Sequence, residues 1–140
     1  MLNLALMRTL RGVISLDNGK LTRVAPGISF NLKWSKILIF HKTIVALGNP
    51  RFIYFMLNPD KKCLAVAASD HKTRESFKVP DYSEIDEPDW EFKINSLPLI
   101  SHIYECCEWN AERTYRADGV LYVDQGLVEF DLAGAFAIND

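Results

Sequence analysis

The sequence predicts an α+β fold that is mostly β and is built from two βαββ-type units with one helix each. Three observations carry this prediction: short segments in which apolar and polar residues alternate, two segments with helical spacing, and the same order of elements on either side of a polar linker. The basic unit spans residues 10–68, the linker residues 69–89 and the acidic unit residues 90–137. Because 49% of the 140 residues are hydrophobic and 24% are charged, we expect a single domain over residues 1–140 with one packed core.

The first unit opens with a hairpin expected over residues 11–24, because an Asp-Asn-Gly sequence separates two short apolar runs. A helix is predicted over about residues 41–48, where apolar residues take helical spacing and a Gly-Asn-Pro sequence ends the element. Alternating or β-branched runs predict the strands of this unit over residues 28–33, 37–39, 51–57 and 63–68.

The second unit repeats this order after the linker, which itself contains one short strand at residues 77–79. A strand over residues 90–94 leads to the longer helix, predicted over about residues 96–109 from apolar residues three and four positions apart. Ser96 is the expected N-cap of this helix. The closing strands are predicted over residues 114–123 and 127–136.

The net charge of −2 hides a strong asymmetry between the two parts of the chain. Residues 1–80 contain thirteen basic and four acidic side chains, whereas residues 81–140 contain three basic and fourteen acidic ones. A basic region attracts polyanions, and an acidic region repels them, mimics them or neutralises the basic region of another copy. Charge therefore indicates nucleic acid, a second copy of this chain or a basic protein as partners.

Several function classes are disfavoured by missing sequence features. The apolar run at residues 1–7 is too short for a membrane span and lacks the features of a signal peptide, so we expect a cytoplasmic protein without a membrane partner. The odd number of cysteines suits reduced thiols. The sequence contains no nucleophile elbow, phosphate-binding loop or dinucleotide motif. We therefore expect that the protein is not an enzyme and that it has neither a small-molecule substrate nor a cofactor.

A metal site is also disfavoured. His102 and Cys106 share a helical face, but a structural zinc ion needs four ligands, and the sequence contains no paired-cysteine or paired-histidine motif. Buried structural cysteines are the preferred interpretation of Cys106 and Cys107. The acidic residues of the linker are interpreted as solvated rather than catalytic.

Residues 35–48 read Ser-Lys-Ile-Leu-Ile-Phe-His-Lys-Thr-Ile-Val-Ala-Leu-Gly. This segment resembles the core of the AbrB/SpoVT swapped-hairpin family, whose pattern runs Gly-Arg-Val-x-Ile-Pro-x-x-Leu-Arg-x-x-Leu-Gly. Ser35 stands at the turn glycine of the family, Lys36 at its arginine, and Leu47-Gly48 at the end of its helix. The resemblance covers residues 28–68, with a weaker echo over residues 90–136.

The chain departs from the family at three positions. Phe40 replaces the proline, and Ile44 and Val45 stand where family members often carry arginine. Such proteins are intertwined dimers or tandem pseudo-dimers that often act as DNA-binding transcriptional regulators or antitoxins. The resemblance therefore implies DNA binding, self-association and, with two units in one chain, the tandem form. The chain also resembles small proteins of Gram-positive gut bacteria in its Leu-Gly-Asn-Pro and Asn-Pro turns, and this likeness implies no activity.

The leading functional hypothesis is a DNA-binding regulator that contacts phosphates through its basic region and stacks or wedges a base with Trp34. The alternative interpretation of these residues is a solvated face with Trp34 in the core. The candidate nucleic-acid-binding residues are Arg23, Lys33, Trp34, Lys36, His41 and Lys42.

The competing hypothesis is a protein-interaction module of the kind encoded by phages and mobile elements, or a mimic of nucleic acid. Such a module would use the acidic region to bind a basic partner. Its candidate contact residues are Glu105, Glu108 and Glu112.

Overall fold

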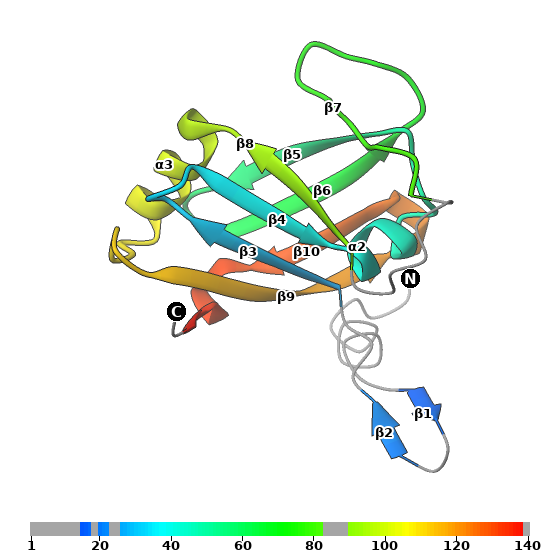
Figure 1. Ribbon diagram of the computed structural model, residues 1–140, viewed down its shortest axis with the longest axis horizontal. Helices are drawn as coiled ribbons and strands as arrows, with labels where there is room; N and C mark the ends of the chain where they lie inside the picture. The colour runs from blue at the N-terminus through cyan, green and yellow to red at the C-terminus, as the bar shows by residue number, and fades with distance from the viewer. Residues whose placement is uncertain (1–14, 18–19, 23–25, 83–89, 139–140) are drawn as a thin grey trace.

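The computed structural model describes residues 15–17, 20–22, 26–82 and 90–138 (Figure 1). These residues form eleven strands, two α-helices and two one-turn 3₁₀ helices. The strands are β1 (Ser15–Asp17), β2 (Lys20–Thr22), β3 (Gly27–Asn31), β4 (Lys36–Phe40), β5 (Phe52–Asn58), β6 (Cys63–Ser69), β7 (Phe77–Lys78), β8 (Glu91–Asn95), β9 (Thr114–Tyr122), β10 (Leu127–Asp131) and β11 (Phe136–Ile138). The helices are α2 (His41–Ala46), α3 (Leu97–Cys106), η1 (Val123–Gln125) and η2 (Leu132–Gly134).

Nine of the strands form one antiparallel sheet that curls into a half-barrel (Figure 1). The strand order is β7-β5-β6-β10-β9-β3-β4-β8. β11 follows η2 and pairs with β9 on the same side as β10. η2 therefore separates two strands, β10 and β11, that both pair with β9. β1 and β2 form a separate two-stranded hairpin.

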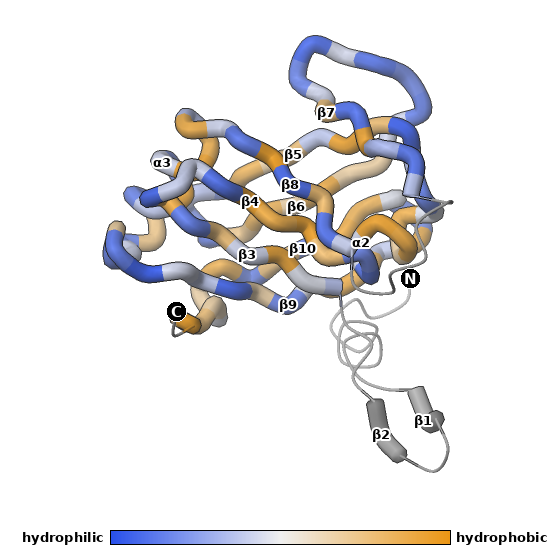
Figure 2. Tube along the Cα trace, in the orientation of Figure 1, coloured by the Kyte–Doolittle hydropathy of each residue, from blue (hydrophilic) through white to orange (hydrophobic). Residues whose placement is uncertain are grey.

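Alternation along the strands decides which face of the sheet is buried. In β4, Ile37 and Ile39 are fully buried, whereas the intervening Leu38 is only partly buried. In β8, Phe92 and Ile94 are buried between exposed polar residues. The tube coloured by hydropathy shows this mixing of apolar and polar positions across the sheet (Figure 2). Burial of the apolar set inside the curled sheet supplies the main driving force for folding.

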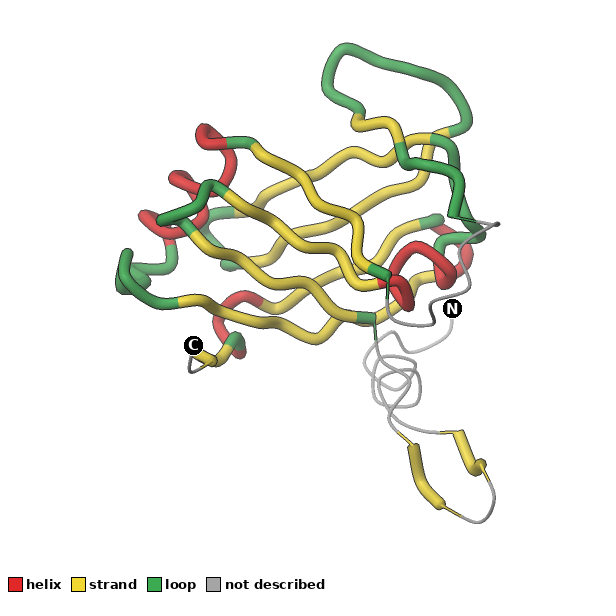
Figure 3. The backbone as a smooth tube through the Cα atoms, in the orientation of Figure 1, coloured by secondary structure: helices red, strands yellow, loops and turns green. Residues whose placement is uncertain are grey.

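The two helices lie at opposite ends of the sheet (Figure 3), and each is tied to β3 by one hydroxyl. In α2, Thr43 Oγ1 accepts a hydrogen bond from Gly27 N and donates one to Gly27 O, both at 2.9 Å. In α3, Tyr104 Oη lies 2.8 Å from Phe30 O and 2.7 Å from Arg113 O. These bonds satisfy buried backbone groups at both ends of β3.

The prediction of a mostly β fold with two helices is confirmed, with three corrections. α3 ends at Cys106 rather than near residue 109, because Glu108 adopts a φ of 55° that a helix does not allow. Ser96 is the N-cap residue, but its side chain makes no capping hydrogen bond. The last predicted strand is broken because Asp131 Oδ1 accepts a hydrogen bond from Ala133 N and turns the chain into η2.

Strands from both predicted units alternate within the one sheet. β9 and β10 lie between β6 and β3, and β8 lies beside β4. The basic and acidic regions of the chain therefore contribute strands to one sheet. Over residues 26–82 and 90–138, basic and acidic side chains are equal in number. No helix among the described residues is long and apolar enough to cross a membrane.

Candidate functional site

The tip of the β3-β4 hairpin carries three of the predicted nucleic-acid-binding residues: Lys33, Trp34 and Lys36. Asn31 Oδ1 accepts a hydrogen bond from Trp34 N at 3.0 Å, and Ser35 adopts a φ of 52°, so the turn has a defined shape. The side chain of Trp34 is not in the core, since the residue is 69% exposed. An exposed tryptophan on a short, hydrogen-bonded turn can stack on a base.

His41 and Lys42 lie at the other end of β4, where α2 begins. A strand rises by about 3.3 Å per residue, so the two groups of predicted residues are separated by roughly 15 Å. His41 N donates to Trp90 O at 3.2 Å, and the His41 ring lies 5.7 Å from the Trp90 ring. The predicted set is therefore divided between two places, and Arg23 lies outside the described residues.

Cross-strand pairing adds two cations that sequence reasoning missed. Lys93 in β8 lies opposite Leu38 in β4, whose other neighbour, Ser29, lies opposite Arg116 in β9. Lys36 is two residues before Leu38 and therefore projects on the same face. We call Trp34, Lys36, Lys93 and Arg116 the hairpin face. Only the strand pairing could have identified Lys93 and Arg116.

Carboxylates limit this basic surface on two sides. Glu91 and Asp118 occupy the same face of the sheet but lie toward α2, at the far ends of the pairings of β8 and β9. Glu112 Oε2 lies 4.0 Å from Lys33 Nζ, and both side chains are largely exposed. Lys33 is thus partly neutralised, which is why we leave it out of the hairpin face.

The three acidic residues of the competing hypothesis are exposed at the C-terminal end of α3 and in the loop that follows. Glu105 belongs to the last turn of the helix, whereas Glu108 and Glu112 precede β9. The contact with Lys33 brings Glu112 to the hairpin tip. The acidic and basic candidates are therefore neighbours rather than separate surfaces.

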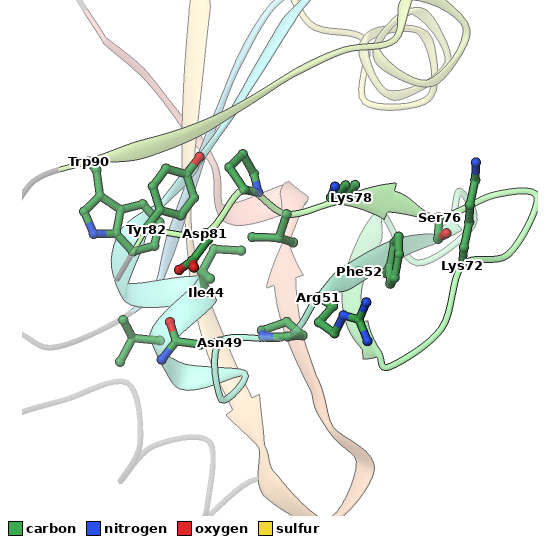
Figure 4. A pocket seen from close by; sticks show the side chains of 14 residues that line it. Ile44, Asn49, Arg51, Phe52, Lys72, Ser76, Lys78, Asp81, Tyr82 and Trp90 are labelled. Carbon is green, nitrogen blue, oxygen red and sulfur yellow. The ribbon is translucent and has the colours of Figure 1, made fainter. Parts of the chain in front are cut away.

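A groove of about 1180 Å³ opens between α2, the start of β5 and the segment around β7 (Figure 4). We call it the α2-β7 groove. Its apolar lining includes Ile44 and Val79, and Tyr82 and Trp90 form an aromatic wall. Arg51, Lys72, Ser76, Lys78, Asn49 and Asp81 are its principal polar side chains.

Local hydrogen bonds position the two sides of the groove. Val79 N donates to Arg51 O at 2.8 Å, which extends the pairing of β7 with β5. Asn49 N donates a hydrogen bond to Ile44 O at 3.0 Å, and the Asn49 residue adopts a φ of 52°. Together these features end α2 and turn the chain toward β5. The Tyr82 ring stacks on Trp90, with centroids 3.8 Å apart and ring planes 11° apart.

The adjacent cysteines lie at the C-terminal end of α3. Cys106 Sγ lies 3.7 Å from Cys107 Sγ, and both residues are partly buried. Burial raises the pKa of the Cys107 thiol to about 12, and the hydrogen bond with Cys106 acts in the same direction. Such a thiol is a poor nucleophile and a poor metal ligand. Within the described parts of the chain, no three His, Cys, Asp or Glu residues are grouped to hold a metal ion.

The hairpin face and the α2-β7 groove are thus the two surfaces with the clearest binding chemistry in the described structure. Both combine cationic side chains with an aromatic ring. Trp34 and Lys36 lie at the start of β4, whereas the Arg116 guanidinium lies 4.6 Å from the ring centroid of Phe40, at the end of β4 nearer the groove. Comparison with protein-family models, curated proteins and solved structures finds no match to this chain.

Proposed function

We propose that this protein is an AbrB-like nucleic-acid-binding regulator that contacts phosphates through the hairpin face. The single observation that carries the proposal is the strand register, in which Lys36, Lys93 and Arg116 share one sheet face, and the turn that precedes Lys36 carries the exposed Trp34. Three cations supply sequence-independent affinity for the phosphate backbone, and the tryptophan supplies a stacking surface.

The sheet order supports the tandem form of the fold. If β3, β4, α2, β5 and β6 make one unit, then β7, β8, α3, β9 and β10 make the second in the same order. β3 pairs with β9 as β7 pairs with β5, while β4 pairs with β8 and β6 with β10 across a twofold relation. We infer that the chain is a pseudo-repeat whose second unit begins at β7 rather than near residue 90.

The proposal is tested by fluorescence anisotropy of a labelled, random-sequence duplex titrated with the full chain between about 50 and 200 mM salt. We expect binding that weakens steeply with salt, because neutralised phosphates release counterions. Lys36→Ala and Lys93→Ala should each reduce the salt slope by about one. Trp34→Ala should weaken binding to a single strand by about tenfold.

Arg74→Ala is the matched control, since Arg74 is exposed in the loop before β7 and belongs neither to the hairpin face nor to the lining of the α2-β7 groove. It should leave duplex binding and the salt slope unchanged. Failure of the wild-type chain to bind the duplex at low salt would overturn the proposal, as would equal losses in Lys36→Ala and Arg74→Ala.

The exposed acidic residues beside the hairpin tip favour a second candidate, in which a basic protein occupies this end of the molecule. Charge reversal of Glu105 and Glu108 should then abolish co-purification of that basic protein and leave duplex binding intact. An unchanged association after charge reversal would eliminate this candidate.

A further inference from the structure

We propose that the α2-β7 groove binds a phosphorylated nucleoside, with the base against Tyr82 and the phosphate held by Arg51 and Lys78. The sequence indicated no small-molecule partner, and this site lies at the opposite end of β4 from the tip of the hairpin face. The same chemistry can come from a free nucleotide or from one nucleotide of a single strand. The binding site is the same in both cases.

Ring contacts hold the aromatic wall of the groove in place. Trp90 is contacted by Tyr82 in a parallel stack and by His41 at an interplanar angle of 58°. Tyr82 is itself only partly buried and lines the groove. A base placed against Tyr82 would contact a ring that the stack on Trp90 already orders, which favours binding.

The polar lining favours an anion. Arg51, Lys72 and Lys78 are exposed, and Asp81 is the single carboxylate among the lining residues. The backbone bond from Val79 N pairs that residue with Arg51, and Lys78, the residue before Val79, lines the same groove. A guanidinium can bind two phosphate oxygens at once, and a neighbouring ammonium adds a point charge.

The arrangement along the groove matches the two ends of a nucleotide. Figure 4 shows Tyr82 and Trp90 at one end of the groove, and Arg51, Lys78 and Lys72 toward the other. Apolar residues, among them Ile44 and Val79, lie between these ends. A ligand with a planar ring at one end and a phosphate at the other satisfies both sets of side chains.

Among the described residues, the groove lies where the proposed pseudo-repeat departs from its twofold symmetry. β3 pairs with β4, but the described residues of β7 and β8 do not pair with each other. α2 is also four residues shorter than α3. It therefore covers less of its own end of the sheet than α3 covers of the opposite end. The proposed binding site depends only on the residues that line the groove.

The test is isothermal titration calorimetry of the full chain with AMP, adenosine, inorganic phosphate and a short oligo-dA strand. AMP should bind saturably, and adenosine and phosphate should each bind at least about tenfold more weakly. Arg51→Glu and Lys78→Glu should each weaken AMP binding by about tenfold or more. Tyr82→Ala should weaken it, whereas Tyr82→Phe should not.

Lys61→Glu is the matched control because Lys61 is an exposed lysine in the β5-β6 turn and does not line the groove. It should leave AMP binding unchanged, and circular dichroism should show that all variants are folded. If oligo-dA binds with the same sensitivity to Lys78→Glu while AMP does not, a single strand is the source of the nucleotide. No saturable binding of AMP or oligo-dA, or equal losses in Lys61→Glu and Lys78→Glu, would overturn the proposal.

The proposals for the groove and for the hairpin face can be overturned independently of each other. Lys36→Ala should weaken duplex binding without changing the AMP titration. Lys78→Glu should weaken AMP binding without changing the salt slope for the duplex.

Discussion

The α3 end and the α2 end of the sheet use aromatic residues in opposite ways. At the α3 end, Trp109 stacks on Tyr115 at 4.3 Å, and Tyr104 meets both rings edge-on. This cluster continues into the core through Phe30. At the α2 end, the Tyr82-Trp90 stack instead forms one wall of an open groove.

The two helices differ in length and in how deeply they contact the sheet. The ten residues of α3 bring Tyr104 deep enough to reach the backbone of β3, and Trp109 follows to close the space. The six residues of α2 reach β3 only through Thr43. Among the described residues, the shorter helix covers less of its end of the sheet, and cationic side chains line one part of the groove beside it.

The largest effect is expected from a substitution at the α3 end of the sheet, the closed end, where the aromatic cluster packs against the core. Tyr104→Ala should lower the free energy of unfolding by about 3–5 kcal/mol, because it leaves a cavity and unpaired backbone carbonyls. Tyr104→Phe should cost about 1–2 kcal/mol, since it removes only the hydroxyl. Urea denaturation measures both. A loss below 1 kcal/mol in Tyr104→Ala would show that the aromatic cluster does not support the core.

A smaller loss of stability is expected at the α2 end of the sheet, the open end, beside the groove. Thr43→Val keeps the shape of the side chain but leaves the N–H and C=O of Gly27 without their buried partner. The free energy of unfolding should fall by about 1–3 kcal/mol. Thr43→Ser retains the hydroxyl and is the control for urea denaturation. Equal losses in both variants would mean that methyl packing, not hydrogen bonding, ties α2 to β3.

The thiol at the end of α3 should make the closed end sensitive to alkaline pH. The pKa of Cys107 is raised from its ordinary value of 9.0 to about 12, so the folded state disfavours the thiolate. Stability from the neutral thiol is present below pH 9 and is lost as pH rises from about 9 toward 12. Thermal melts at several alkaline pH values should show a smaller fall in Tm for Cys107→Ala than for the wild type. Parallel curves would contradict this prediction.

The smallest effect is expected from the ion pair between the hairpin tip and the closed end. Lys33 Nζ and Glu112 Oε2 are 4.0 Å apart, and both side chains are more than half exposed. Lys33→Ala should therefore change the free energy of unfolding by less than about 0.5 kcal/mol. Chemical denaturation with Glu112→Ala as the reciprocal variant measures this, and a loss above 1 kcal/mol would show a stronger coupling between the two regions.

Local pattern predicted the elements well because alternation and helical spacing are local properties. The strands β3, β4, β5, β6, β8 and β9 lie close to their predicted ranges. The end of α3 and the break at Asp131 were missed, since a positive φ at Glu108 and a side-chain bond to Ala133 leave no periodic signal. Helix and strand boundaries depend on such single contacts.

The candidate sites were predicted only in part. Trp34 and Lys36 were identified from their place in a basic hairpin, and they do lie together. Lys93 and Arg116 were not, because they join this surface through pairings between strands far apart in the chain. Lys42 was grouped with the hairpin residues by sequence proximity, although a strand separates them.

A mostly β fold with two helices follows from the sequence alone, because the period of its apolar residues distinguishes strand from helix. The tertiary structure was needed to show which strands are neighbours, that the two oppositely charged regions of the chain share one sheet, and that a groove lies beside α2 in the described part of the chain. The physical reason is that side-chain periodicity selects a local conformation, whereas strand order depends on contacts between distant segments, which no local pattern encodes.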